Sequence, residues 1–386
     1  MDPDIKRALG AVFIARTAAN AGLRVVYPFL PAIARGLGVS PVTLSTVIAV
    51  RNLGGLATPA AARASERFGR RWMMLAAILS VALGCALTSA SDRFVLAAVG
   101  IVLVGLAKPA FDIPMQAWFG DRVPYGERGR VFGITELTWA TALLVAAPLS
   151  GILIELTDWR APFVLVAAWA ALGAMAVARA IEPDAPHEWR PGSLAFTAPR
   201  VRMLGVALLF SIAAEIPFIV YGQWLEETFG LSISGIGVFT LAVVLAEFMG
   251  EGLVVLVADR MGLRRMILSG LLVSGIAYLG LSVAGSVLAV AALVVVVWIA
   301  AFEVTIVAAI PFVSELAAEA RDRLLSMLAV MIALGRAIGA LVAQPLYAAG
   351  GISLGGMVSA CCVCVAALML LTVEEPREAG AAPIQL

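Results

Sequence analysis

Long apolar runs are the feature of this sequence that most restricts its fold. Twelve runs follow one another, separated by breaks that are short and polar or marked by Gly and Pro, and about 20 apolar residues are enough to span a bilayer. Of the 386 residues, 62% are apolar and 14% are charged, whereas soluble domains have roughly 45 to 50% and about 25%. We therefore predict an all-α membrane protein with twelve transmembrane helices, over residues 8–34, 42–63, 72–90, 94–119, 130–155, 161–180, 202–226, 233–257, 265–283, 286–313, 324–348 and 352–372.

The basic residues are distributed unevenly between the two sides of the predicted helices. Nineteen fall in loops and tails on the side of the N-terminus, three fall on the opposite side, and five lie within helices. Because loops rich in Lys and Arg stay in the cytoplasm, we expect both termini to be cytoplasmic. Arginine supplies 25 of the 27 basic residues, which suggests a GC-rich bacterial genome. We therefore expect a multi-pass protein of the bacterial plasma membrane, in contact with the lipid bilayer.

A tandem repeat relates the two halves of the chain. The arginines of two loops, Arg128 and Arg321, are separated by 193 residues. The same offset relates Glu66-Arg67-Phe68-Gly69-Arg70-Arg71 to Asp259-Arg260-Met261-Gly262-Leu263-Arg264-Arg265. Between the copies lies a polar stretch with four prolines. We predict two pseudo-symmetric bundles of six helices, at residues 1–181 and 201–374, with a cytoplasmic linker at 182–200 and a cytoplasmic tail at 375–386.

The repeated segment resembles the signature of the major facilitator superfamily: an acidic residue, Arg, any residue, Gly and two basic residues. The resemblance covers nearly the whole chain and implies a cavity at the bilayer midplane, between two halves that rock against each other. It also implies that both copies form a cytoplasmic gate, with the residues Glu66, Arg67, Gly69, Arg70, Arg71, Asp259, Arg260, Gly262, Arg264 and Arg265.

The first predicted helix is similar to that of the twelve-helix drug and proton antiporter branch of this family. Gly22 is followed after five residues by Pro28 and then by Pro31, while Pro148 in the fifth helix lacks the glycine that precedes it in the branch's second motif. The Arg and Gln-Gly pattern usual in the fourth helix is missing. The resemblance implies a proton-coupled exporter of small amphipathic or drug-like compounds, which works by alternating access and needs no cofactor besides the proton gradient.

Charged residues inside the predicted helices are the candidates for proton coupling, because such a charge costs at least about 2.5 kcal/mol on insertion. At a rise of about 1.5 Å per residue, one group in the N-terminal half shares a depth: Arg16, Asp112 and Glu136. A second group lies near the midplane of the C-terminal half: Glu215, Glu247, Glu303 and Arg336. Neighbouring carboxylates in a low-dielectric cavity cannot both ionise cheaply. Since the single histidine, His187, falls in the linker, proton chemistry in the cavity must use carboxylates.

Aromatic and amphipathic residues on the expected cavity helices would suit a substrate that is partly apolar. The candidate substrate contacts are Arg24, Tyr27, Trp139, Tyr221 and Phe302.

Two other functions remain open from the sequence. The chain could carry organic anions or metabolites, bound by Arg16, Arg24, Arg51 or Arg336, or it could be a receptor or assembly factor that does not transport. We predict no enzyme, because the sequence contains no Ser/His, Cys/His or phosphate-loop constellation. The four cysteines lie in apolar runs, so we expect no metal site. We further expect a monomer that binds no nucleic acid.

Overall fold

The computed structural model describes residues 2–183, 196–284, 287–316 and 321–373, and the regular structure in these ranges is entirely helical. This confirms the predicted all-α fold class. The elements are α1 (Pro3–Arg24), α2 (Leu30–Gly36), α3 (Pro41–Asn52), the 3₁₀-helix η1 (Leu53–Ala57), α4 (Thr58–Phe68), α5 (Arg70–Ala90), α6 (Phe94–Arg122), α7 (Tyr125–Leu156), α8 (Ala161–Ala180), α9 (Ala198–Phe229), α10 (Ile233–Met261), α11 (Leu263–Val283), α12 (Leu288–Leu316) and α13 (Arg321–Leu371).

The first two predicted spans are broken helices, which corrects the continuous helices expected at 8–34 and 42–63. α1 ends at Arg24 and α2 begins at Leu30, with turns between them. The ring of a proline clashes with the carbonyl four residues earlier, so Pro28 prevents the helix from continuing past Arg24. In the second span, α3 passes into η1 at the pair Gly54-Gly55, where glycine weakens the α-helix.

Nine described helices are long and apolar enough to cross a membrane, or ten if the bent pair 30–36 and 41–68 is one span. α13 contains two of the predicted spans, because Gly350 and Gly351 leave the helical conformation in its middle, and Gly351 has a φ of 63°. These glycines form the expected break between the last two spans. The expected break at Gly285 lies outside the described residues.

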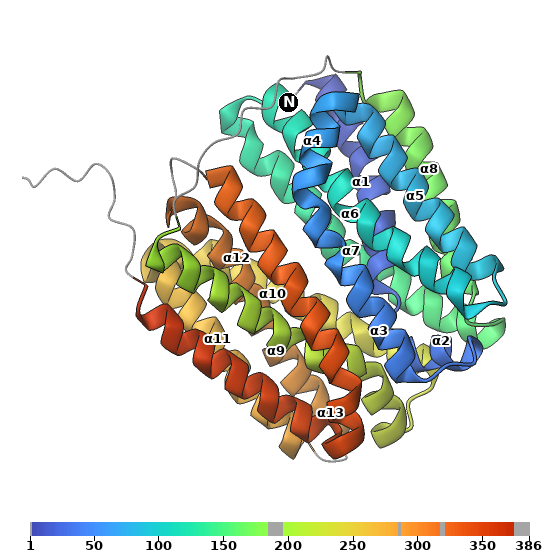
Figure 1. The fold of residues 1–386 in the computed structure, drawn as a ribbon, viewed down its shortest axis with the longest axis vertical. Helices are drawn as coiled ribbons and strands as arrows, with labels where there is room; N and C mark the ends of the chain where they lie inside the picture. The colour runs from blue at the N-terminus through green and yellow to red at the C-terminus, as the bar shows by residue number, and fades with distance from the viewer. Residues whose placement is uncertain (1, 184–195, 285–286, 317–320, 374–386) are drawn as a thin grey trace, which may run out of the picture.

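The helices form two groups, α1–α8 and α9–α13, each packed mainly within itself. Figure 1 shows them side by side, blue to green in the first group and yellow-green to red in the second. The groups meet where α7 packs on α10, α3 on α13 and α2 on α9. Most of the predicted linker 182–200 and the whole predicted tail 375–386 lie outside the described residues, so these boundaries stay predictions.

The bundle has two ends, which differ in how the halves meet. We call one end the basic side, because it carries the N-terminus and the arginine-rich turns at Gly69 and Gly262. The opposite side carries the end of α2 and the turn between α9 and α10. Toward the basic side, the ribbons of α4 and of the first turns of α13 diverge (Figure 1).

On the opposite side, polar and close backbone contacts hold the halves together. Nη2 of Arg35 lies 2.9 Å from Oε1 of Glu226, and the backbone N–H of Ser234 donates to Glu155 at 2.9 Å. Gly222 on α9 faces the carbonyl of Pro28, where an added Cβ would lie 2.2 Å from the oxygen. The halves are therefore closed against each other at this end.

Candidate functional site

A tyrosine hydroxyl lies at the centre of the contact between the halves. Tyr27, in the turn after α1, accepts hydrogen bonds from Nη2 of Arg51 and Nη2 of Arg336, both at 2.8 Å. It donates to Oε1 of Glu215 at 2.8 Å. One donor and two acceptor positions are all that a hydroxyl offers. The break in the first span thus places a fully satisfied hydroxyl among three charged groups.

Glu215 on α9 receives donors from both halves. Besides Tyr27, it accepts from the side-chain amide of Asn52 at 2.9 Å and from Nε of Arg336 at 2.8 Å. Its side chain is only 3% exposed. Arg51 also donates to the carbonyl of Leu23 at 2.6 Å, which satisfies one of the groups left open at the end of α1. The arrangement links α1, α3, α9 and α13 through buried hydrogen bonds.

Arg24 forms a second link between the halves. Its guanidinium pairs with both carboxylate oxygens of Glu247 on α10, with Nη1 at 3.1 Å from Oε2, and both side chains are almost fully buried. The same Nη1 donates to the carbonyl of Trp139 on α7 at 2.7 Å, and the guanidinium carbon lies 4.3 Å from the Trp139 ring centroid. Arg24 therefore joins α7 to α10.

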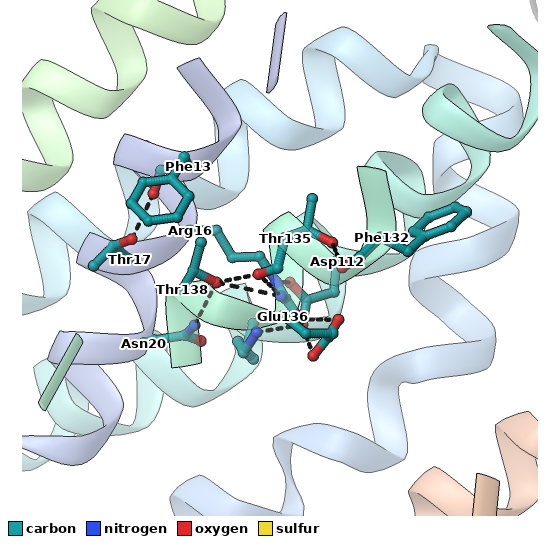
Figure 2. A network of polar contacts seen from close by, with 10 residues as sticks. Phe13, Arg16, Thr17, Asn20, Asp112, Phe132, Thr135, Glu136 and Thr138 are labelled. Carbon is teal, nitrogen blue, oxygen red and sulfur yellow. Dashed lines mark hydrogen bonds and ion pairs between the residues drawn. The ribbon is translucent and has the colours of Figure 1, made fainter. Parts of the chain in front are cut away.

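A third network lies within the N-terminal half (Figure 2). Nε of Arg16 is 3.0 Å from Oδ1 of Asp112, and Nη2 is 3.1 Å from Oε1 of Glu136. Lys108 pairs with the other oxygen of Asp112. Arg16 also donates to the hydroxyl of Thr138 at 3.2 Å. The side chain of Glu136 is 56% exposed, so this network has one face that reaches beyond the packed interior.

Two further carboxylates lie beside Glu247 without a basic group of their own. Glu251 follows it by one turn on α10 and is half-buried. Glu303 on α12 is 5% exposed, and no hydrogen bond or ion pair joins it to another described residue. Glu247 and Glu251 both lie within electrostatic reach of Glu303. Three carboxylates therefore share the neighbourhood of Arg24, and Arg336 is also within electrostatic reach of Glu303.

The aromatic candidates divide between this centre and the packed interior. Phe218 lies 4.8 Å from Tyr27, 5.5 Å from Tyr221 and 6.0 Å from Trp298 between ring centroids. Tyr221 is 1% exposed and its hydroxyl is 3.3 Å from that of Thr240. In a separate contact, Phe302 packs edge to face on Phe210 at 5.9 Å. Tyr27 and Trp139 thus contact the charged groups directly, while Phe302 packs in the C-terminal half.

The two predicted gate segments have the same local structure. Gly69 and Gly262 have φ of 89° and 82°, a conformation that side chains with a Cβ rarely adopt. After each glycine, an arginine caps the last turn of a helix: Arg71 donates to the carbonyl of Ala178 at 2.6 Å. Gly69, Arg71 and Ala178 each have a counterpart 193 residues later, at Gly262, Arg264 and Leu371.

The counterpart in the second copy is Arg264, which donates to the carbonyl of Leu371 at 2.7 Å. In the first copy, Arg70 pairs with Asp121 at 2.6 Å and Arg67 lies over the Phe68 ring at 5.4 Å. Each of these contacts stays inside its own half. The remaining predicted gate residues lie in or beside the same turns: Glu66, Asp259, Arg260 and Arg265.

Sequence reasoning missed several uncharged polar groups of the site. Asn52 donates to Glu215, and Thr138 receives donors from Arg16 and Asn20. The dipeptide Arg51-Asn52 inside an apolar run was a signal for the first of these, whereas threonine occurs too widely in membrane helices to mark a site. Among the described residues, no group of three or more His, Cys, Asp or Glu side chains has an arrangement that could hold a metal ion.

Two helical halves meet around buried charged groups, an arrangement that many secondary transporters share. The model of the Major Facilitator Superfamily matches residues 12–202 and again 203–386. The chain therefore belongs to the major facilitator superfamily. It is a multi-pass membrane protein of a transporter family and not an enzyme.

Individual relatives are distant. The chain is 27% identical over 140 residues to "Uncharacterized MFS-type transporter YwfA" of Bacillus subtilis (strain 168), which covers 36% of this chain and 34% of the relative. It is 26% identical over 188 residues to "Purine ribonucleoside efflux pump NepI" of Escherichia coli O127:H6, covering 48% of each. The matches thus span less than half of these curated relatives.

The fold is similar to solved structures along its whole length. One is the crystal structure of a bacterial homologue of the human lysosomal transporter Spinster in an inward-facing and occupied conformation. It superposes with a TM-score of 0.77, at 14% identity, over 97% of this chain and 98% of the other. At this identity the likeness concerns the fold alone.

Proposed function

We propose that the protein is a proton-coupled antiporter that exports small amphipathic compounds, as in the drug and proton antiporter branch. The observation that carries the proposal is Glu303, buried in a spanning helix without a described partner, beside Glu247 and Glu251. Burying a lone carboxylate is costly, so this group is suited to exchange a proton during transport. The efflux pump among the relatives agrees with export.

The proposal includes an orientation. With both termini in the cytoplasm, the basic side faces the cytoplasm and the contacts of Arg35 with Glu226 lie on the outer side. The described conformation would then be closed outward. The plasma membrane and the monomeric state belong to the same proposal.

The cavity arginines are less suited to bind an anionic substrate, because each is already engaged. Arg24 pairs with Glu247, and Arg336 pairs with Glu215. Arg51 donates to Tyr27 and to a backbone carbonyl. An organic anion would have to displace a carboxylate from Arg24 or Arg336, or the hydroxyl and carbonyl oxygens from Arg51. The anion carrier is therefore the second candidate, and a receptor that does not transport is the third.

Transport by the purified protein in liposomes under an imposed pH gradient tests the proposal. The probes are ethidium as an organic cation, inosine as a nucleoside and benzoate as an organic anion. We expect gradient-driven movement of ethidium or inosine, reduced at least about tenfold by Glu303→Gln. Glu315→Gln serves as the control, because Glu315 is an exposed acid on the same helix.

Each alternative has its own result in this experiment. Probe flux that is the same with and without the pH gradient, and the same in Glu303→Gln as in the parent protein, contradicts proton coupling. Movement of benzoate that is lost with Arg336→Ala but kept in Glu303→Gln and Glu215→Gln favours the anion carrier. A correctly folded protein that moves none of the three probes favours the receptor.

A further inference from the structure

The guanidinium of Arg24 joins α7 to α10, two helices that belong to different halves. Arg24 donates to the Trp139 carbonyl on α7 and to the Glu247 carboxylate on α10. Both charged side chains of this bridge are buried, at 2% and 3% exposed. The bridge therefore fixes the two helices at this level in the described conformation.

One turn from the bridge toward the basic side, each helix carries a carboxylate. Glu136 precedes Trp139 by three residues and Glu251 follows Glu247 by four. Because the two helices run in opposite directions, both offsets point toward the basic side, by about 4.5 Å and about 6 Å along the axes. Glu136 is exposed and Glu251 is half-buried, and the two carboxylates, which belong to different halves, lie within electrostatic reach of each other.

The charged groups around this pair leave an excess of negative charge. Arg24 is bound to Glu247, and Arg16 is shared between Glu136 and Asp112. The charged groups that face Glu251 are Glu247, Glu303, Glu136 and Arg24. Those that face Glu136 are Arg16, Lys108 and Glu251. No guanidinium among these contacts is left to pair with Glu251.

Glu303 adds a second, independent observation at the same place. Its Cβ would be 2.6 Å from a Cβ added at Gly250, the residue before Glu251, so it packs directly on α10. Its exposed fraction is only 5%, and no hydrogen bond or ion pair joins it to another described residue. A carboxyl group that has no described partner thus lies beside α10 at the level of Glu251 and within electrostatic reach of it.

We propose that Glu136 and Glu251 form a proton-binding contact that controls closure of the basic side. When the halves rock and α7 approaches α10 at this level, the two carboxylates face each other in a medium of low dielectric. Like charges at such a distance repel strongly, so closure requires a proton on one of them. The inference rests on the proposed function, since it names where the coupled proton acts.

Spin labels on the two gate turns report this closure directly. Phe68 and Met261 are equivalent positions in the two copies, 60% and 37% exposed. The labels are attached to Phe68→Cys and Met261→Cys after replacement of Cys85, Cys361, Cys362 and Cys364. Double electron–electron resonance spectroscopy then measures the distance between the two labels in liposomes. We expect the short-distance population to fall at least about fivefold between about pH 5.5 and about pH 8.5, because closure at the higher pH has to bring two ionised carboxylates together.

Variants assign the pH dependence to the pair. Glu136→Gln and Glu251→Gln should each reduce the change to less than about twofold, because one carboxylate then faces a neutral amide. Glu251→Asp should keep the parent response, and so should Asp158→Asn, a change in an exposed acid on the opposite side. The inference would be overturned if the distances between the labels in the parent protein did not change with pH. It would also be overturned if the glutamine variants showed the same change with pH as the parent.

Probe transport in the same liposomes separates the two proposals. Gradient-driven ethidium or inosine flux, combined with glutamine variants that close like the parent, overturns only the contact between Glu136 and Glu251. A closure that depends on pH and on both residues, without gradient-driven flux of any probe, supports the contact and contradicts proton-coupled transport.

Discussion

At the scale of single residues, buried hydrogen bonds between charged and neutral groups decide how the halves meet. Tyr27 makes the largest number of these contacts through one atom, because its hydroxyl bonds to Arg51, Arg336 and Glu215. A buried donor that loses its acceptor costs about 1 to 3 kcal/mol. The Arg24 to Glu247 pair follows the same logic, since removal of either partner would leave a buried charge.

Tyr27→Phe should lower the free energy of unfolding by about 1 to 3 kcal/mol and also reduce transport. The phenyl ring keeps the packing on Phe218 but removes one acceptor from each of two guanidinium groups, those of Arg51 and Arg336. Thermal melting in detergent and probe flux in liposomes measure the two effects.

Tyr278→Phe is the matched control, because the Tyr278 hydroxyl is also buried but, among the described residues, accepts only from the indole of Trp298, at 2.9 Å. We expect a comparable loss of stability with normal transport. Equal loss of transport in both variants would assign the effect to stability alone.

At the scale of elements, two features of the backbone matter most. The first span breaks after Arg24 and so presents Tyr27 and the α1 carbonyls to Arg51. The turns at Gly69 and Gly262 set α5 and α11 against the preceding helices with positive φ. Both features follow from proline or glycine at fixed places, and both therefore respond to substitution in a predictable way.

Gly69→Leu should slow transport while leaving the affinity for substrate nearly unchanged. A side chain at φ 89° strains the turn by about 1 to 3 kcal/mol, and the turn lies on the basic side, away from the charged centre. The maximal flux and the half-saturating concentration of the transported probe are the two measurements.

Gly120→Leu provides the control on the same side of the bundle, since a Cβ at Gly120 meets open space within a helix. It should leave transport unchanged. A large loss of affinity in Gly69→Leu would contradict a gating role for the turn.

At the scale of the whole molecule, the described conformation joins the halves at one end. Arg35 and Glu226 connect them on the opposite side, next to a cavity of about 180 Å³ that Val39 and Gln223 also line. Arg35 is exposed and Glu226 is partly exposed, so we expect the pair to bias the equilibrium between conformations and to contribute little to stability.

Arg35→Glu should open the opposite side, because it places an acid against Glu226. Labelling of Val39→Cys by a membrane-impermeant thiol reagent, in a background without the native cysteines, measures the opening. We expect labelling to rise about twofold to fivefold, in line with the contribution of about 0.2 to 1 kcal/mol from an exposed pair.

Combining Arg35→Glu with Glu226→Arg recreates the pair in reverse and should restore the original labelling. If the single and the double variant label alike, the charge pair does not hold this end closed.

The fold could be predicted largely from sequence because its determinants are local. The length of each apolar run defines a spanning helix, and a proline or glycine marks where one breaks. The break within the first span was still missed, because an apolar run of that length also permits a kinked but continuous helix. The depth estimate placed Arg16, Asp112 and Glu136 at one level, and the structure brings these three together.

The sequence by itself therefore determined a helical membrane protein with a repeat of 193 residues and two equivalent turns. Only the tertiary structure decided which buried charges meet: Arg24 with Glu247, 223 residues apart, and Glu215 with Tyr27 and Arg336. The physical reason is that insertion and helix breaks depend on neighbouring residues, whereas pairing depends on which helix faces meet across the two halves.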